Sequence, residues 1–275
     1  MTPPPDASLS LYDRLRAGAK QIIIDGEPYW RVEGDLLLDD DQLHLYAQRQ
    51  EALKEARAAA QAAGLGLVAT ADLVGMTENG RIVRWAPGME LTYAVLRNTF
   101  TLGGDDGYQL TVDSIRQATV DWESTCGVRF VHKRELDESA GLTPPGALFI
   151  VREFDTGGEL IAAAFFPTDP VNRRRVLIDP SFYAPTLSFD RVGVLRHELG
   201  HVLGFRHEHI RSERPPGCPD EDTYGTINLS DYDPSSVMHY FCGGVGSRTL
   251  AITEKDRSAS QRVYGAPLSD FHLVR

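Results

Sequence analysis

The sequence has only three cysteines in 275 residues and no apolar run long enough to span a membrane. A transmembrane helix needs about 20 consecutive apolar residues, so we predict no membrane partner. The start, MTPPPDASLS, lacks the apolar core of a secretory signal. Basic residues are also few, 28 against 39 acidic ones, which gives a net charge of −11. Because binding to nucleic acid needs clustered Lys and Arg, we expect no nucleic-acid partner.

The scarce cysteines allow at most one disulfide within the chain. Cys218 and Cys242 lie 24 residues apart, and a disulfide that closes such a loop would stabilise the fold by roughly 3 kcal/mol. The alternative is two free buried thiols. Cys126 is then left over, and we expect it to be a core residue.

The acidic charge is densest near the start, where residues 1–80 hold 13 acidic and 7 basic side chains. Residues MTPPPDAS read as disordered, and QIIIDGEPYWRVEGDLLL reads as two strands around a Gly-Glu-Pro turn. Residues 39–64 have an acidic start, good helix formers and a glycine stop, which predicts a long helix. GLGLVATADLVGMTENGR reads as a loop. We place a boundary near residues 75–83, which divides the chain into 1–79 and 80–275.

Beyond this boundary the pattern changes to short strands and helices separated by turns. The predicted strands are 90–96, 128–133, 147–152, 162–166 and 174–179. The predicted helices are 111–125, 190–204 and 254–265. This mixture indicates an α+β fold in which helices pack on a sheet, followed by a loop-rich C-terminal part.

The stretch HELGHVLGFRHEH, residues 197–209, holds four histidines and two glutamates among apolar residues. His197 and His201 are four residues apart, so on a helix both imidazoles lie on one face and can bind one metal ion. Gly204 can end the helix in the left-handed conformation, which lets His207 return as a third ligand. Three histidines leave a position open for water, which is typical of a catalytic zinc site.

Glu198 stands beside the first ligand, where a general base can take a proton from water at the metal. HExxH alone could be a helix with two surface histidines. The extended pattern HExxHxxGxxH, at the end of an apolar helix, favours the metal site.

HExxHxxGxxH followed by a methionine turn is the metzincin pattern, and SSVMHY, residues 235–240, resembles that turn. The closer resemblance is to the astacin family of zinc endopeptidases. HELGHVLGFRHEHIR resembles the astacin signature, VRWAPGMELTYAV the opening of the catalytic domain, and TCGVRF the segment around its first cysteine. The resemblance covers about residues 80–265 and is specific in 197–211 and 235–240.

The resemblance implies a metzincin-like α+β fold with a twisted mixed sheet and helices above a zinc cleft, one Zn²⁺ and a protein or peptide substrate. It implies that Met238 forms an apolar floor under the metal and that Tyr240 is an additional ligand that can also support an oxyanion. Glu208 would bond toward the amino terminus of the matured domain, or else be an exposed charge. His209 and His239 are not expected to be ligands.

The implied reaction is hydrolysis of peptide bonds, in which zinc polarises the carbonyl and Glu198 moves the proton. One alternative is a matrixin-like metzincin protease, against which the Glu208 and Tyr240 matches argue. The other is a catalytically dead zinc-binding interaction protein, against which an intact Glu198 argues. AAAFF, residues 162–166, is either the sheet edge that pairs with an extended substrate or a plain core strand.

Members of the astacin family resemble one another in having a pro-segment with a Phe-X-Gly-Asp motif. The Asp of this motif binds the zinc and keeps the enzyme latent. Here Val32-Glu33-Gly34-Asp35 has Val at the aromatic position. Residues 1–79 would then be a pro-segment with Asp35 as a ligand of the latent form, and 80–275 the catalytic domain. The alternatives are a Gly-Asp hairpin turn and a permanent subdomain.

The chain also departs from the animal astacins. Only 30 residues separate His207 from Met238, and Cys126 has no evident partner, so we describe it as a bacterial-type, minimal relative. The resemblance implies a secreted protein, although no signal peptide is visible, and we expect a monomer.

Overall fold

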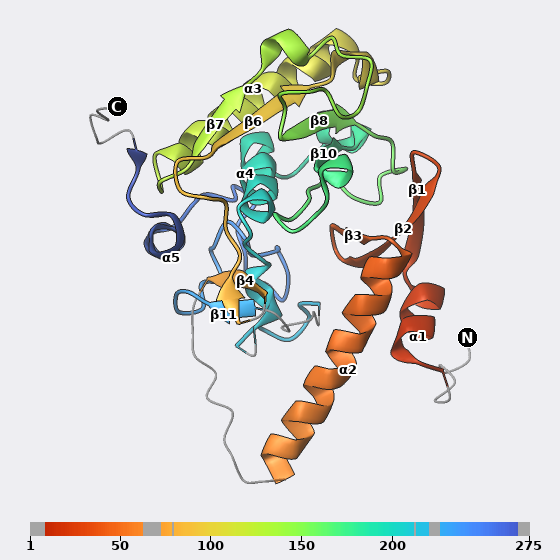
Figure 1. Ribbon diagram of the computed structural model, residues 1–275, viewed down its shortest axis with the longest axis vertical. Helices are drawn as coiled ribbons and strands as arrows, with labels where there is room; N and C mark the ends of the chain where they lie inside the picture. The colour runs from red at the N-terminus through yellow and green to blue at the C-terminus, as the bar shows by residue number, and fades with distance from the viewer. Residues whose placement is uncertain (1–8, 63–72, 79, 212, 220–225, 269–275) are drawn as a thin grey trace. The chain divides into compact units, whose positions relative to one another are not determined.

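The computed structural model describes residues 9–62, 73–78, 80–211, 213–219 and 226–268. They divide into two compact units, one up to residue 62 and one from residue 73 onward (Figure 1). The division at 79/80 into pro-segment and catalytic domain stays a prediction. Among the described helices, none is both long and apolar enough to cross a bilayer.

The first unit is a three-stranded antiparallel sheet with two helices. Its elements are α1 (Leu11–Gly18), β1 (Lys20–Ile24), β2 (Glu27–Glu33), β3 (Leu36–Leu38) and α2 (Asp40–Ala62). The predicted hairpin and long helix are confirmed, but the expected Gly-Glu-Pro turn is wrong. Asp25 and Gly26 form the turn with φ of 56° and 87°, and positive φ at both central positions is what a type I′ hairpin turn requires. Pro28 lies in β2.

Helix α1 was not predicted from the sequence. The Ser10 side chain accepts a hydrogen bond from the Asp13 N–H at 3.1 Å, which caps the helix at its start. The predicted disordered start, residues 1–8, lies outside the described residues.

The second unit is built on a five-stranded sheet in the order β7-β6-β8-β10-β9. Its strands are β6 (Glu90–Val95), β7 (Arg129–His132), β8 (Phe149–Glu153), β9 (Ala162–Ala163) and β10 (Arg175–Ile178). Neighbouring strands are parallel except β9, which pairs antiparallel with β10 at the sheet edge. Five strands were predicted in these places, so the mixed sheet is confirmed and the fold is α+β.

The main core of this unit lies on one face of the sheet. Successive side chains of a strand point to opposite faces, so Tyr93 and Val95 enter the main core while Ala94 and Leu96 join a small cluster on the other face. Helices α3 (Gly104–Glu123) and α4 (Arg191–Val202) pack on one another and supply the rest of this core, together with α5 (Glu254–Tyr264). The metal-binding motif is therefore carried by a helix fixed in the core.

Helix α3 begins seven residues earlier than predicted, at Gly104 rather than 111. The carboxylate of Glu153, at the end of β8, accepts hydrogen bonds from the Leu102 and Gly103 N–H groups, each at 2.7 Å. This support comes from a residue far along the chain, so local periodicity could not reveal it.

A second small sheet has the order β11-β4-β5, with β4 (Val74–Glu78), β5 (Arg81–Ile82) and β11 (Thr226–Asn228). The loop predicted here is wrong for β4 and β5. On its other side β4 pairs with residues 204–206: the Met76 N–H donates to the Gly204 carbonyl at 2.9 Å, and the Arg206 N–H donates to the Val74 carbonyl at 2.7 Å. Residues 74–78 have a weak local propensity for a strand, and they form one because they pair with distant segments.

Short 3₁₀ helices complete the described structure: η1 (Arg97–Thr99), η2 (Arg134–Leu136), η3 (Val171–Arg173), η4 (Pro180–Tyr183) and η5 (Glu208–Ile210).

Candidate metal centre

Three histidines of the second unit meet at the end of α4. His197 and His201 are one turn apart on this helix, and Gly204, with φ of 90°, turns the chain so that His207 comes back beside them. The ligand atoms of the three side chains all lie within 4.8 Å of one another. All three residues are buried, at 1–4% exposure. This geometry allows the three side chains to bind one cation, and it excludes the alternative of separate surface histidines.

Two backbone carbonyls set which ring nitrogen faces this cation. The Val237 carbonyl lies 2.8 Å from His197 Nδ1, and the Phe205 carbonyl lies 2.8 Å from His201 Nδ1. A carbonyl oxygen can only accept, so each Nδ1 must carry the hydrogen and each Nε2 keeps its lone pair. Metal-ligating histidines are usually oriented in this way. Neutral imidazole nitrogens at this spacing suit Zn²⁺.

Met238 packs directly against the motif helix. A Cβ atom at Gly200 would lie 2.3 Å from the Met238 sulfur, so a glycine at 200 is what allows the thioether to approach so closely. Met238 is completely buried. It therefore lies against the turn of α4 that separates His197 from His201, as an apolar neighbour of the site.

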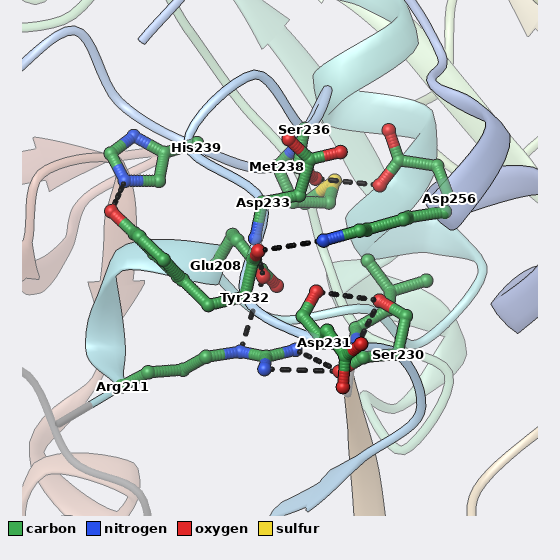
Figure 2. A network of polar contacts seen from close by, with 12 residues as sticks. Glu208, Arg211, Ser230, Asp231, Tyr232, Asp233, Ser236, Met238, His239 and Asp256 are labelled. Carbon is green, nitrogen blue, oxygen red and sulfur yellow. Dashed lines mark hydrogen bonds and ion pairs between the residues drawn. The ribbon is translucent and has the colours of Figure 1, made fainter. Parts of the chain in front are cut away.

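The turn that carries Met238, residues 235–240, is held by Asp256 of α5 (Figure 2). The Asp256 carboxylate accepts from Ser236 Oγ at 2.6 Å and from the Val237 N–H at 3.0 Å, and its burial raises its pKa. Because the carbonyl of Val237 also binds His197, Asp256 and His197 are linked through the backbone of this one residue. Asp256 was not predicted from the sequence, although Thr253-x-x-Asp256 forms a capping box, a pattern that can be recognised in a sequence.

Tyr240 lies among the histidines. Its ring centroid is 4.4 Å from that of His207 and 4.5 Å from that of His209, and its side chain is half-buried. His239 forms hydrogen bonds with its ring: its nitrogens lie 2.5 Å from the Tyr240 carbonyl and 2.7 Å from Tyr232 Oη. Burial lowers the pKa of His239 to about 4, so the ring is neutral. The ligand role of Tyr240 stays a prediction.

The two glutamates of the motif are both buried. Glu198 is 2% exposed and follows His197 directly on α4, and Glu208 is 0% exposed. An exposed helix-flanking charge is therefore the wrong alternative for Glu208. Its Oε1 accepts from the Asp233 N–H at 2.9 Å and lies 3.2 Å from Arg211 Nε. Burial raises the pKa of Glu208, and the Arg211 guanidinium beside it opposes that shift and favours the charged carboxylate.

Asp35 lies in the turn between β2 and β3 of the first unit, after Gly34 with φ of 58°. Its role as a ligand of a latent form stays a prediction.

The disulfide Cys218–Cys242 is confirmed, and Cys126 is a free buried thiol in the core, also as expected. Burial raises the pKa of Cys126 to about 12, so it should resist alkylation. Non-reducing peptide mapping of the folded protein is expected to yield one cross-linked pair and Cys126 unmodified. If all three thiols react without reductant, the disulfide does not form under those conditions.

Three histidines in HExxHxxGxxH, a buried glutamate beside the first and a methionine against the helix are brought together as the metzincin pattern predicts. No family model matches the chain. High choriolytic enzyme 1 from Oryzias latipes is 39% identical over 61 residues, 18% of this chain and 23% of that protein. The astacin-like metalloendopeptidase from Coturnix japonica is 40% identical over 76 residues, 21% of this chain and 19% of that protein.

The chain is thus similar in sequence to two proteases of the astacin type over a limited segment. It spans about a fifth of the length of these two curated relatives. The solved structure of myroilysin is similar at a TM-score of 0.46 and 19% identity, over 67% of this chain and 97% of that one.

Proposed function

We propose that the chain is a zinc-dependent endopeptidase that hydrolyses peptide bonds of proteins and is made as a latent zymogen. The observation that carries the proposal is the convergence of His197, His201 and His207 around one point, with the Nε2 lone pairs of His197 and His201 available and a buried glutamate alongside. The astacin-type homology supports the choice of a peptide bond as the substrate.

A zinc ion held by the three imidazoles would polarise a peptide carbonyl and acidify a water molecule. Glu198 follows His197 on the helix and is rotated from it by about 100°, so its carboxylate stands to the side of the ligand face. There it would accept the proton of the attacking water and return it to the leaving nitrogen. Tyr240 would donate a hydrogen bond to the oxyanion of the tetrahedral intermediate.

The substrate would bind as an extended strand. Strand β9 is the outermost strand of the five-stranded sheet, and an edge strand can pair with an extended peptide through main-chain hydrogen bonds. This position favours the edge interpretation of AAAFF over that of a strand enclosed within the sheet. Pairing with a substrate remains part of the proposal.

The direct test is proteolysis of a denatured protein with and without a chelator. We expect cleavage by the zinc-loaded chain, after limited proteolysis if it is latent, loss of cleavage with chelator, and recovery when zinc is restored. Glu198→Gln protein prepared in the same way controls for a contaminating protease. Cleavage that survives complete zinc removal would contradict the proposal. A chain that binds zinc and never cleaves would favour the interaction-protein alternative.

Latency is proposed to depend on Asp35. A carboxylate on the open position of the metal would displace the water that Glu198 must activate. Asp35→Ala should then raise the activity of the uncut full-length chain toward that of the proteolysed chain, unless the rest of the segment blocks access. Asp25→Ala, at the other turn of the same sheet, is the matched control.

A zinc-loaded crystal structure of the full-length chain would decide whether Asp35 binds the metal. Carboxylate oxygens of Asp35 more than about 4 Å from the metal, far beyond the ~2.0–2.2 Å of a Zn–O bond, would reject the switch. Residues 1–79 would then be a subdomain of another role.

A further inference from the structure

One arginine outside the expected site lies next to the third ligand. Arg211 is 2% exposed, although arginine is rarely buried unless its charge is paired. Its Nε lies 3.2 Å from Glu208 Oε1, and Glu208 directly follows His207. Both side chains of the pair are 1% exposed, so water does not screen their interaction as it would at the surface.

The same guanidinium reaches a second segment. Nη1 and Nη2 of Arg211 both donate to the Ser230 carbonyl, each at 3.1 Å (Figure 2). Three residues later, the Asp233 N–H donates to the same Glu208 oxygen that Arg211 pairs with. Arg211 and Glu208 therefore tie residues 207–211, which we name the third-ligand segment, to residues 230–233.

The tied segment leads into the methionine turn. The Glu208 N–H donates to the Met238 carbonyl at 2.8 Å, and Thr253 Oγ1 donates to Asp233 Oδ2 at 2.8 Å. The third-ligand segment is thus fastened at its backbone to residue 238 and at its side chains to residues 230–233. Only a group with several donors in a fixed plane can bridge a carboxylate and a carbonyl in this way.

We infer that Arg211 is a positioning residue for the metal centre: through Glu208 and the Ser230 carbonyl it holds the third-ligand segment so that His207 meets His197 and His201. The inference rests on the proposed zinc site and gives a role to Arg211, which lies four residues beyond the last histidine of HExxHxxGxxH. The partners of Arg211 are Glu208 and the Ser230 carbonyl, so we expect its effect in zinc binding before it appears in turnover.

The test measures zinc affinity of the full chain by chelator competition, and the melting temperature with and without zinc. Arg211→Met should weaken zinc binding roughly tenfold or more, within the ~10–100-fold range seen when supports of ligands are lost. Arg211→Lys keeps the charge but cannot bridge both acceptors, so a smaller loss is expected. The double variant Glu208→Gln/Arg211→Met leaves no unpaired buried charge. It should therefore recover part of the zinc affinity that Arg211→Met alone loses.

The matched control is Arg257→Met, because Arg257 also pairs with a glutamate three residues before it, Glu254, but at 37% and 90% side-chain exposure. It should leave zinc affinity unchanged. A general structural role for Arg211 would lower the melting temperatures of the zinc-free and zinc-loaded forms equally, whereas weaker zinc binding shrinks the difference between them.

Wild-type zinc affinity in both Arg211→Met and Arg211→Lys would overturn the inference. If Arg211→Met does not fold, Arg211→Lys decides alone: weakened zinc binding supports the inference and unchanged binding overturns it. Failure of the wild-type chain itself to bind zinc would instead reject the proposed function.

Discussion

Glu198→Gln is expected to lower peptide hydrolysis by at least ~10²-fold, because general acid–base catalysis typically contributes ~10²–10⁴-fold. Glutamine keeps the shape of the side chain but cannot accept the proton. Glu198 is not among the three clustered ligands, so the variant should still bind about one zinc per chain. Steady-state kinetics on a peptide, with zinc content measured on the same sample, checks both parts.

The control for this variant is Glu254→Gln, whose side chain is 90% exposed on α5. It should hydrolyse peptide at the wild-type rate. Near-wild-type turnover by zinc-loaded Glu198→Gln would rule out Glu198 as the base, whereas loss of zinc along with activity would place it in metal binding.

His201→Ala should abolish tight zinc binding and with it all zinc-dependent hydrolysis. His201 is the central ligand: its ring centroid lies 4.9 Å from that of His197 and 4.8 Å from that of His207. Two remaining imidazoles do not complete a three-ligand site. After dialysis, the zinc content should fall from about one per chain to nearly none.

His44→Ala is the matched control, because His44 is an exposed histidine on α2 in the other unit. It should keep the full zinc content. Circular dichroism of zinc-free His201→Ala separates ligand loss from unfolding. A folded His201→Ala chain that retains stoichiometric zinc would show that the ligand assignment is wrong.

The parts of the site that the sequence reveals are those fixed by helical spacing. His197, Glu198 and His201 occupy known positions of one helix, and Gly204 is a recognisable helix end. The strands of the main sheet were also readable, because runs such as ALFIVR are apolar and β-branched.

The missed parts depend on residues distant in the sequence. Strand β4 exists through pairing with residues 204–206 and 226–228, and the start of α3 depends on Glu153. Arg211 and Asp256 act through backbone groups of other segments. A buried arginine and a solvated one look alike in a sequence, so neither the burial of Arg211 nor its contact with the Ser230 carbonyl could be predicted.

If the chain is made as the proposed zymogen, the pairing of β4 limits which peptide bonds can be cut to mature it. Residues 75–83, the boundary expected from the sequence, fall on β4 and β5, and a break there would detach a strand that is hydrogen-bonded along both edges. The N–H of Leu73 donates to Ser230 Oγ at 2.7 Å, and its carbonyl accepts from the Leu229 N–H at 2.6 Å. A cut that preserves these bonds must precede Leu73. Leu73 lies beside Ser230, and Arg211 binds the carbonyl of Ser230. The number of residues left ahead of Leu73 after such a cut would therefore determine how far the new amino terminus is from Glu208.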